Sequence, residues 1–429
     1  MLFVGKIGFR SLVVPAALGF FFSAAIAVFA GEFARKWLPN LLLILASTTI
    51  FLVIGDLVLR YALADSFYYR PVERFLAPNL EMPDRLIHYM KNKSWEGNTY
   101  GDMIAMSGKF EYQEMRHVKV ETDELGFRNM PHQADKPSKY ILLGDSFGLG
   151  VGSHQDSILS SFLEASSGEQ VYNLSFPGYP YQGLLNLAIH LDRIELTEDP
   201  VIIWLLFTGN DLPFPHRDPA REKLVSALTN GNLDQHLEKN VFNRTKVRIE
   251  AWFKRSAYRK IRAQLRFRKT LETTGNPDIH VANLPGGHPV LFHQTYIESA
   301  LTSADSIRSL GDYKSYEDVF ITAAKFCESK GVELKIISLP VKFEIYRWLF
   351  EKRVPGSTPY QPSGFSKVVK DICNENNIPF YDFAPFLDAY SSDLLENQNS
   401  ITWWRDDTHF NAHGYRALHQ FVRDSVLVD

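Results

Sequence analysis

The sequence predicts a three-layer α/β/α sandwich with a mostly parallel five-stranded sheet, preceded by N-terminal transmembrane helices. Short apolar runs alternate with helix-length segments over the C-terminal two thirds of the chain, and two long apolar stretches lie near its start. The composition, 45% hydrophobic and 22% charged over 429 residues, is that of a folded globular protein. We therefore expect a membrane anchor over 1–64, an irregular linker or extension over 65–138, and a main domain over 139–429.

The two N-terminal apolar stretches cover about 12–31 and 41–63. Each has roughly the ~20 residues that a membrane-spanning helix needs. A cleaved secretory signal is the alternative for the first stretch, because residues 28–30 resemble a small-residue cleavage site. The second stretch follows at once, which favours a hairpin of two helices over a cleaved signal or a single anchor. Asp56 and Arg60 lie four residues apart near the end of the second stretch and predict an interfacial ion pair.

The orientation of this anchor is weakly specified by charge. Lys6 and Arg10 precede the first stretch, whereas Arg35 and Lys36 lie between the two. A hairpin places its two ends on the same side of the membrane, so the positive-inside rule gives nearly a tie. The residues alone leave the side of the main domain open.

The segment 65–138 combines scattered prolines with a Trp/Tyr-bearing stretch over 94–100. Proline interrupts both helices and central strands, so no regular element is expected to run far here. We interpret the segment as a linker with a small packing extension. Its prolines are Pro71, Pro78, Pro83, Pro131 and Pro137.

Apolar runs of strand length alternate with segments of helical periodicity from residue 139 onward. The expected strands are 140–143, 170–174, 201–207, 332–338 and 378–383. The expected helices are 157–165, 183–194, 316–329, 365–374 and 412–426. Because buried parallel strands join through helices, this order predicts the doubly wound sandwich, with a site at the carboxyl ends of the strands.

The alternation lapses in an insertion over about 212–313, which is rich in Lys and Arg between 246 and 269. Apolar residues are interleaved with these cations, so the segment fits a basic amphipathic helix. A solvated helix that caps the sheet is one interpretation. Docking onto anionic lipid headgroups or another anionic polymer is the alternative.

The bulk charge and the cysteine count exclude several classes of protein. A net charge of -3 gives no support for a nucleic-acid partner, which would require a basic excess. Cys327 and Cys373 are too few for a disulfide framework and lie too far apart in sequence for a Cys-x-x-Cys metal site. We expect two core thiols, although one bridge stays open.

A candidate nucleophile and its base lie at two strand-to-helix junctions. The Gly-Asp-Ser sequence at 144–146 follows the first expected strand, so Ser146 would be exposed at a turn. A serine hydroxyl is a poor nucleophile and needs a base that is oriented by a third group. His409, three residues after Asp406, fits that base and orienter. The alternative is that Asp406 or Asp407 only caps the last helix and that His409 is a surface residue.

Two further positions suit an oxyanion hole. Gly178 follows the second expected strand and Asn210 the third. The backbone N–H groups of Ser146 and Gly178, with the side-chain amide of Asn210, would supply three donors to a tetrahedral intermediate. Taken singly, each is better explained as a turn glycine or a loop asparagine.

Together, these four blocks resemble those of the SGNH (GDSL-like) hydrolase superfamily over about 139–429. The resemblance implies a flavodoxin-like sandwich, Ser146 as nucleophile, and His409 as base with Asp406 as its orienter. It also implies oxyanion donors from Ser146, Gly178 and Asn210, without a metal or organic cofactor. Phe147 stands where many members carry leucine, and the insertion is long for the minimal fold.

The segment Asp123–Asn129 is similar to the approach to the core in membrane-anchored bacterial members, which often modify cell-surface polysaccharides. The resemblance therefore implies a bacterial inner-membrane protein with an extracytoplasmic catalytic domain. We expect a serine esterase or deacylase acting through an acyl-serine on an acylated carbohydrate or lipid-linked substrate. One alternative is an O-acyltransferase that modifies a cell-surface or exported polysaccharide and takes its acyl group from a membrane donor protein. Another is a noncatalytic, membrane-anchored glycan-binding or assembly module.

Overall fold

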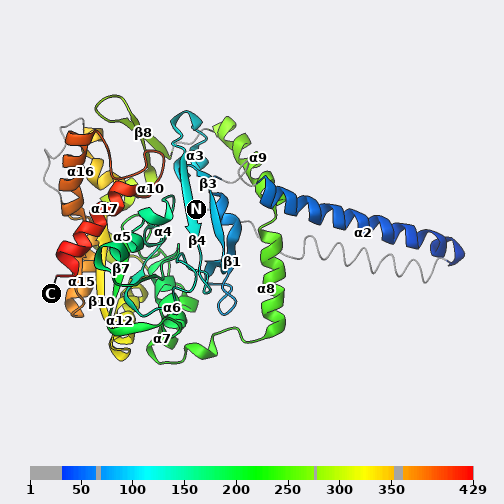
Figure 1. Ribbon diagram of the computed structural model, residues 1–429, viewed down its shortest axis with the longest axis horizontal. Coiled ribbons are helices and arrows are strands. Elements are labelled where there is room, and N and C mark those ends of the chain that lie inside the picture. Colours follow the sequence, from blue (N-terminus) through cyan, green and yellow to red (C-terminus); the bar gives the residue numbers. More distant parts are fainter. Residues whose placement is uncertain (1–30, 64–68, 275–277, 352–360, 429) are drawn as a thin grey trace.

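The computed structural model describes residues 31–63, 69–274, 278–351 and 361–428 (Figure 1). The first expected membrane span, over 12–31, lies outside these residues except for its last one. The described residues from 69 onward form a body, and the long helix that begins at Gly31 projects from it.

The predicted fold class is confirmed, because the body is built on a five-stranded sheet whose strands are all parallel. The strand order is β11-β10-β7-β5-β6. Each strand matches an expected apolar run: β5 (Ser138–Leu143), β6 (Val171–Asn173), β7 (Leu196–Phe207), β10 (Glu333–Leu339) and β11 (Phe380–Asp382). All residues of β7 from Val201 to Phe207 are buried, as a central strand covered on both faces requires.

Helices cover both faces of the sheet, and the alternation of side chains along the strands separates two cores. Ile202, Trp204 and Leu206 of β7 belong to one core, whereas Ile203 and Leu205 belong to the other. The first core is closed by α6 (Pro180–His190), α12 (Tyr313–Ser329) and α15 (Gly364–Glu375). The second is closed by α5 (Leu159–Ser167), α16 (Ala384–Gln398) and α17 (Ala412–Phe421), which continues into a π-helical turn over Val422–Val426.

The segment expected to be an irregular extension contains two antiparallel strand pairs. These are β1 (Leu76–Pro78) with β2 (Ile87–Tyr89) and β3 (Ser94–Thr99) with β4 (Arg116–Glu121). A 3-10 turn (Pro71–Phe75) precedes β1, and helix α3 (Asp102–Ser107) with a second 3-10 turn (Phe110–Tyr112) joins β3 to β4. Phe75, Tyr89 and Trp95 are buried in the first core of the sandwich. The extension is therefore part of the folded body.

The projecting helix is α2 (Gly31–Ala62). Its stretch Trp37–Ala62 is long and apolar enough to cross a membrane, with a mean hydropathy of 2.4 and only 6% of the apolar window buried. This stretch includes most of the second expected span, 41–63. The predicted ion pair between Asp56 and Arg60 forms, and both side chains are buried.

The basic insertion divides into a part near α2 and a part near the sheet. After α7 (Pro219–Thr229), helices α8 (Val241–Lys254) and α9 (Ala257–Thr274) run beside the base of α2, with α8 against β1 (Figure 1). The two basic helices therefore do not cap the central sheet. The chain returns through a hairpin of β8 (Ile279–Asn283) and β9 (Pro289–His293), then α10 (Gln294–Leu301) and α11 (Ala304–Arg308). Two short helices follow β10: α13 (Lys342–Tyr346) and α14 (Trp348–Glu351).

The two cysteines are buried and free, as expected of core thiols. Burial raises the pKa of Cys327 and Cys373 to about 12.

Candidate active site

Ser146 is the first residue of the one-turn helix α4 (Ser146–Leu149), directly after β5. The turn requires glycine at 144, where φ is 158° and a Cβ would lie 2.9 Å from the carbonyl oxygen of Leu205. Asp145 caps the helix, because its Oδ1 accepts a hydrogen bond from the N–H of Phe147 at 2.8 Å. These constraints hold the half-buried Ser146 at the carboxyl end of the sheet.

The structure brings the predicted base to the predicted nucleophile. Nε2 of His409 lies 2.8 Å from Oγ of Ser146, although the two residues are 263 positions apart. Nδ1 of the same ring lies 2.7 Å from Oδ1 of Asp407. A ring protonated at Nδ1 donates to Asp407 and leaves Nε2 to accept the serine proton. The ring of Phe147 lies 5.0 Å from that of His409 and covers it.

The acidic partner of His409 is Asp407 and not the expected Asp406. Asp407 Oδ1 also accepts the backbone N–H of His409 at 3.2 Å, so a tight local turn places this carboxylate beside the ring. The expected contact between Asp406 and His409 is therefore not formed.

Asp406 is directed toward the N-terminal extension. Its Oδ2 accepts the backbone N–H groups of Gly101 and Glu114, both at 2.9 Å, and its Oδ1 accepts from Nη1 of Arg116 at 2.7 Å. The backbone approaches so closely that a Cβ at Gly101 would lie 1.8 Å from the carbonyl oxygen of Asp406. Asp406 thus fastens the histidine-bearing loop to the extension.

Two buried arginines from the extension surround Asp407. Nη2 of Arg70 lies 2.8 Å from each carboxylate oxygen of Asp407, and Nη2 of Arg116 contacts its Oδ2. Burial alone would raise the pKa of Asp407, but Arg70, Arg116 and His409 outweigh it and hold this pKa well below its usual range. Asp407 is thus ionised beside His409. Neither arginine lies in a recognisable motif, so their part in the site could not be predicted from the sequence.

Asp102 adds a second carboxylate near the imidazole, with its Oδ2 3.8 Å from Nδ1 of His409. Its Oδ1 accepts the backbone N–H of Thr408 at 3.0 Å, and its Oδ2 accepts the hydroxyl of Thr408 at 2.5 Å. Burial and the charge of Asp407 raise the pKa of Asp102. Ligand atoms of Asp102, Asp407 and His409 lie within 4.8 Å of one another, a spacing that could hold a metal ion. Arg70 already donates to both oxygens of Asp407, however, so the donor set fits a triad better than a cation site.

The expected oxyanion donors are placed in part. The N–H of Ser146 lies at a helix start, where backbone donors have no partner within the helix. Asn210 lies beside Asp145: burial raises the pKa of Asp145, and a hydrogen bond from the Asn210 side chain opposes this rise. Gly178 packs against Gln182, whose Oε1 would lie 2.7 Å from a Cβ at 178. The roles of Asn210 and Gly178 at an oxyanion stay predictions.

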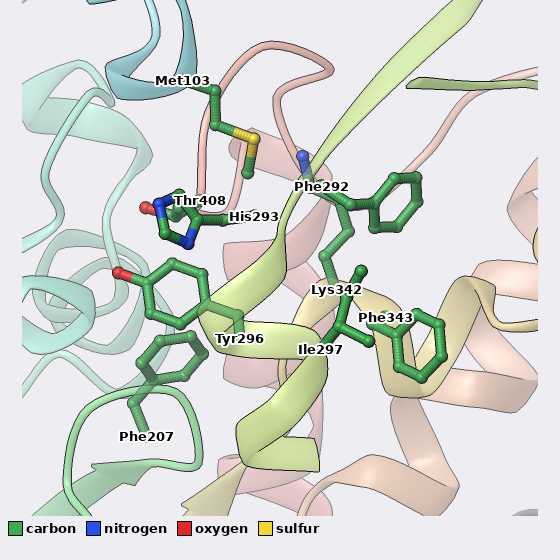
Figure 2. A pocket seen from close by; sticks show the side chains of 9 residues that line it. All are labelled: Met103, Phe207, Phe292, His293, Tyr296, Ile297, Lys342, Phe343 and Thr408. Carbon is green, nitrogen blue, oxygen red and sulfur yellow. The ribbon is translucent and has the colours of Figure 1, made fainter. Parts of the chain in front are cut away.

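A mainly apolar pocket opens beside the loop that carries Asp407, Thr408 and His409 (Figure 2). Sequence reasoning missed it, because its walls come from the hairpin, α10 and α13 as well as from the extension. Tyr296 lines this pocket together with Thr408, and burial, with the charges of Asp102, Asp145 and Asp407, raises the pKa of its phenol. The pocket is lined by Met103, Phe207, Phe292, His293, Tyr296, Ile297, Lys342, Phe343 and Thr408.

Lys342, which also lines this pocket, supports the loop that carries His409. Its Nζ donates to the carbonyl oxygens of Trp404 at 2.8 Å and Asp407 at 2.6 Å. Burial lowers its pKa to about 8. Lys342 therefore ties the backbone at Trp404 to the backbone at Asp407.

The parallel sandwich and the Ser-His-Asp geometry are typical of hydrolases that cleave esters through a serine. The family model for the GDSL-like Lipase/Acylhydrolase family matches residues 142–417, well over half of the chain. The chain belongs to this family, which supports ester hydrolysis in general. A comparison with curated proteins finds no match.

Two solved structures are similar to the chain at low identity. "Crystal Structure of TesA" shares 11% identity with a TM-score of 0.32, covering 67% of this chain and 97% of that one. A lipolytic protein of the G-D-S-L family from Desulfitobacterium hafniense DCB-2 shares 15% identity with a TM-score of 0.27, covering 66% and 97%. At these TM-scores the likeness says nothing about individual residues.

Proposed function

We propose that this chain is a membrane-anchored serine ester hydrolase that acts through an acyl-serine intermediate. The observation that carries the proposal is the unbroken line of contacts from Ser146 to His409 at 2.8 Å and from His409 to Asp407 at 2.7 Å. A nucleophile, a base and an orienting carboxylate in this geometry are what acyl transfer needs.

The reaction proceeds in two stages. Oγ of Ser146 attacks the acyl carbon while Nε2 of His409 takes the serine proton, and ionised Asp407 stabilises the imidazolium that forms. The oxyanion accepts from the N–H of Ser146, with Asn210 and Gly178 as the further donors. His409 then protonates the departing alkoxide. Water, activated by the same imidazole, attacks the acyl carbon and releases the acid.

The substrate we propose is an acylated carbohydrate or a lipid-linked ester. An anchor of the length and hydropathy of Trp37–Ala62 would keep the active site close to a membrane surface, where such esters are concentrated. The apolar side chains of Met103, Phe207 and Ile297 suit the acyl portion of the substrate.

The mechanism is tested by Ser146→Ala in the full chain with p-nitrophenyl esters. The variant should lose about 10³–10⁶-fold in kcat and should no longer react with a fluorophosphonate probe. Ser161→Ala is the matched control, because Ser161 is half-buried and bonds the carbonyl of Gln155 outside the site. Unchanged turnover in Ser146→Ala would contradict the proposal.

Hydrolysis and transfer are separated by the second acceptor. The enzyme is incubated with an activated acetyl ester, with and without an oligosaccharide. Free acetate as the sole product supports the hydrolase, whereas an acetylated oligosaccharide supports the O-acyltransferase alternative. Absence of probe labelling on a folded protein with an open pocket would instead support a noncatalytic module.

A further inference from the structure

Helix α8 carries a stripe of exposed apolar side chains. Phe242, Ile249 and Phe253 are 77%, 45% and 37% exposed, and the neighbouring Val241 is 75% exposed. Positions seven and eleven residues apart on a helix lie within about 20° of the same direction, so Phe242, Ile249 and Phe253 share one face. A helix of a water-surrounded protein normally turns such a face toward its core.

The opposite face of α8 is the one that packs on the body. Ala251 is 6% exposed, and Arg244 and Val247, which share its face, are half-buried. Directly after the helix, Arg255 donates to the carbonyl oxygen of Leu76 in β1 at 3.0 Å. The orientation of α8 is therefore fixed, with its apolar stripe turned away from the body.

The turn between α8 and α9 is attached to the end of the apolar helix α2. Oδ1 of Asp56 accepts from the hydroxyl of Ser256 at 2.6 Å and from the N–H of Ala257 at 2.7 Å. Arg60 donates to the carbonyl oxygen of Trp252 at 3.3 Å. In Figure 1, α2 leaves the body on the side along which α8 lies, and α8 runs across its direction. A bilayer crossed by α2 would therefore have α8 along its surface.

The charges of α8 complement an anionic surface. The helix carries four cationic residues and one acidic residue, Glu250. Lys246, Arg248 and Lys254 form no ion pair within the part of the chain that the structure describes. Cations that flank an exposed apolar stripe are typical of helices that lie at the boundary between headgroups and acyl chains.

We infer that α8 is an interfacial helix that docks on the anionic lipid surface from which α2 emerges. Phe242, Ile249 and Phe253 enter the boundary between headgroups and acyl chains, while the lysines and arginines beside them bind headgroup phosphates. A lipid surface is the occupant because the stripe lies beside the exposed apolar surface of α2. This second attachment fixes the catalytic body against the bilayer. The inference rests on the proposed anchoring but not on the ester chemistry.

The test uses the full chain in vesicles of phosphatidylcholine alone and with about 30 mol% phosphatidylglycerol. A fluorophore is attached to Phe242→Cys or Ile249→Cys, and to Glu396→Cys on α16 as the exposed control. The native cysteines stay unlabelled because they are 1% and 0% exposed. Nitroxide-bearing lipid should lower the fluorescence of the α8 labels on the order of twofold or more, whereas iodide in solution should have little effect on it. The label at position 396 should be quenched by iodide and not by the lipid.

The role of the cations is tested by Lys246→Glu with Arg248→Glu. In anionic vesicles this pair of changes should increase the quenching of the label at position 249 by iodide. The control pair Lys367→Glu and Lys370→Glu makes the same charge change at exposed positions of α15 and should leave that quenching unchanged. If iodide quenched the α8 labels as strongly as the control label, the docking proposal would be overturned. Equal lipid quenching in both vesicle types would overturn the anionic preference. Either result is independent of turnover by Ser146, so it is distinguishable from failure of the proposed function.

Discussion

Asp406 and Asp407 are adjacent in sequence but bind different partners. Asp407 contacts the imidazole of His409, whereas Asp406 holds the backbone N–H groups of Gly101 and Glu114. Loss of the Asp407 carboxylate should therefore affect the chemistry, and loss of the Asp406 carboxylate should affect the stability of the loop.

Asp407→Asn should lower kcat by about 10²–10⁴-fold, because the amide cannot stabilise the imidazolium and favours the wrong tautomer. Asp406→Asn should keep kcat within about tenfold but lower the Tm, because it weakens a buried ion pair with Arg116. Steady-state kinetics on a soluble ester and thermal unfolding measure both. A larger loss of kcat in Asp406→Asn, with an unchanged Tm, would reverse the assignment.

Sequence reasoning found Ser146 and His409 but chose the wrong aspartate as the partner of the histidine. Carboxylates two or three residues before a histidine can both reach its ring. Asp407 is the partner because Asp406 is bound elsewhere. Its Oδ2 accepts the N–H groups of Gly101 and Glu114, which lie about 300 positions away in the chain. A pattern within one loop contains no information about that contact.

Arg70→Met should shift the acidic limb of the activity profile toward higher pH. Arg70 helps to hold the pKa of Asp407 low, so its loss raises that pKa and Asp407 becomes neutral at a higher pH. The depressed pKa also contributes folding stability that is present above the unfolded value and lost as pH falls, so part of this stability should disappear as well. The profile of kcat/KM over pH measures the shift. Arg217→Met, which removes an exposed ion pair with Glu222, should leave the profile unchanged.

At the scale of elements, β2 and α6 are joined by a buried polar cluster. Nε2 of His88 lies 2.9 Å from Oδ1 of Asn186, and Nδ2 of Asn79 lies 3.3 Å from ring nitrogens of both His88 and His190. Burial lowers the pKa of His88 to about 4 and lowers that of His190 well below its usual value. Both rings are therefore held neutral between the extension and the sandwich.

The cluster should make the fold sensitive to acid. Between about pH 6.5 and 4 the unfolded chain binds protons that the folded histidines do not, so stability falls as pH falls through this window. The loss from His88 alone is at most about 3 kcal/mol. His88→Gln should flatten the pH dependence of the unfolding free energy, measured with urea, whereas His132→Gln at an exposed site should not. An unchanged slope in His88→Gln would contradict this role.

The elements that could be predicted are those with a strong local period. The central strands β5 and β7 contain continuous apolar runs, the other three central strands are largely apolar, and helices such as α12 and α15 carry a clear apolar face, so each was found within a few residues. The strands of the extension are three to six residues long, and β1 contains Pro78. Their stability comes from pairing and from packing on the sandwich, which a local pattern does not report.

At the scale of the whole molecule, a buried polar cluster around Asp56 and Arg60 joins the anchor to the body. Asp56 and Arg60 were expected to pair, but their links to Ser256, Ala257 and Trp252 join segments about 200 positions apart. The basic character of α8 and α9 was visible in the sequence. Their position beside α2 was not, because it is set by this long-range capping of α9 by Asp56.

Asp56→Ala should loosen the body from the anchor. The change removes the acceptor for the N–H of Ala257 and leaves Arg60, which is 1% exposed, without its carboxylate. Spin labels at Ile50→Cys on α2 and Glu169→Cys on the body, measured in nanodiscs by double electron–electron resonance, should show a broader distance distribution. The control is Ser47→Ala, because the Ser47 hydroxyl donates to the carbonyl oxygen of Ile44 within α2 at 3.1 Å; this variant should keep the distance distribution narrow. Among the residues that the structure describes, α2 packs chiefly on α9, so kcat on a soluble ester should stay within about threefold. An equally narrow distribution in Asp56→Ala would show that contacts of α8 with the body hold the orientation without the anchor's carboxylate.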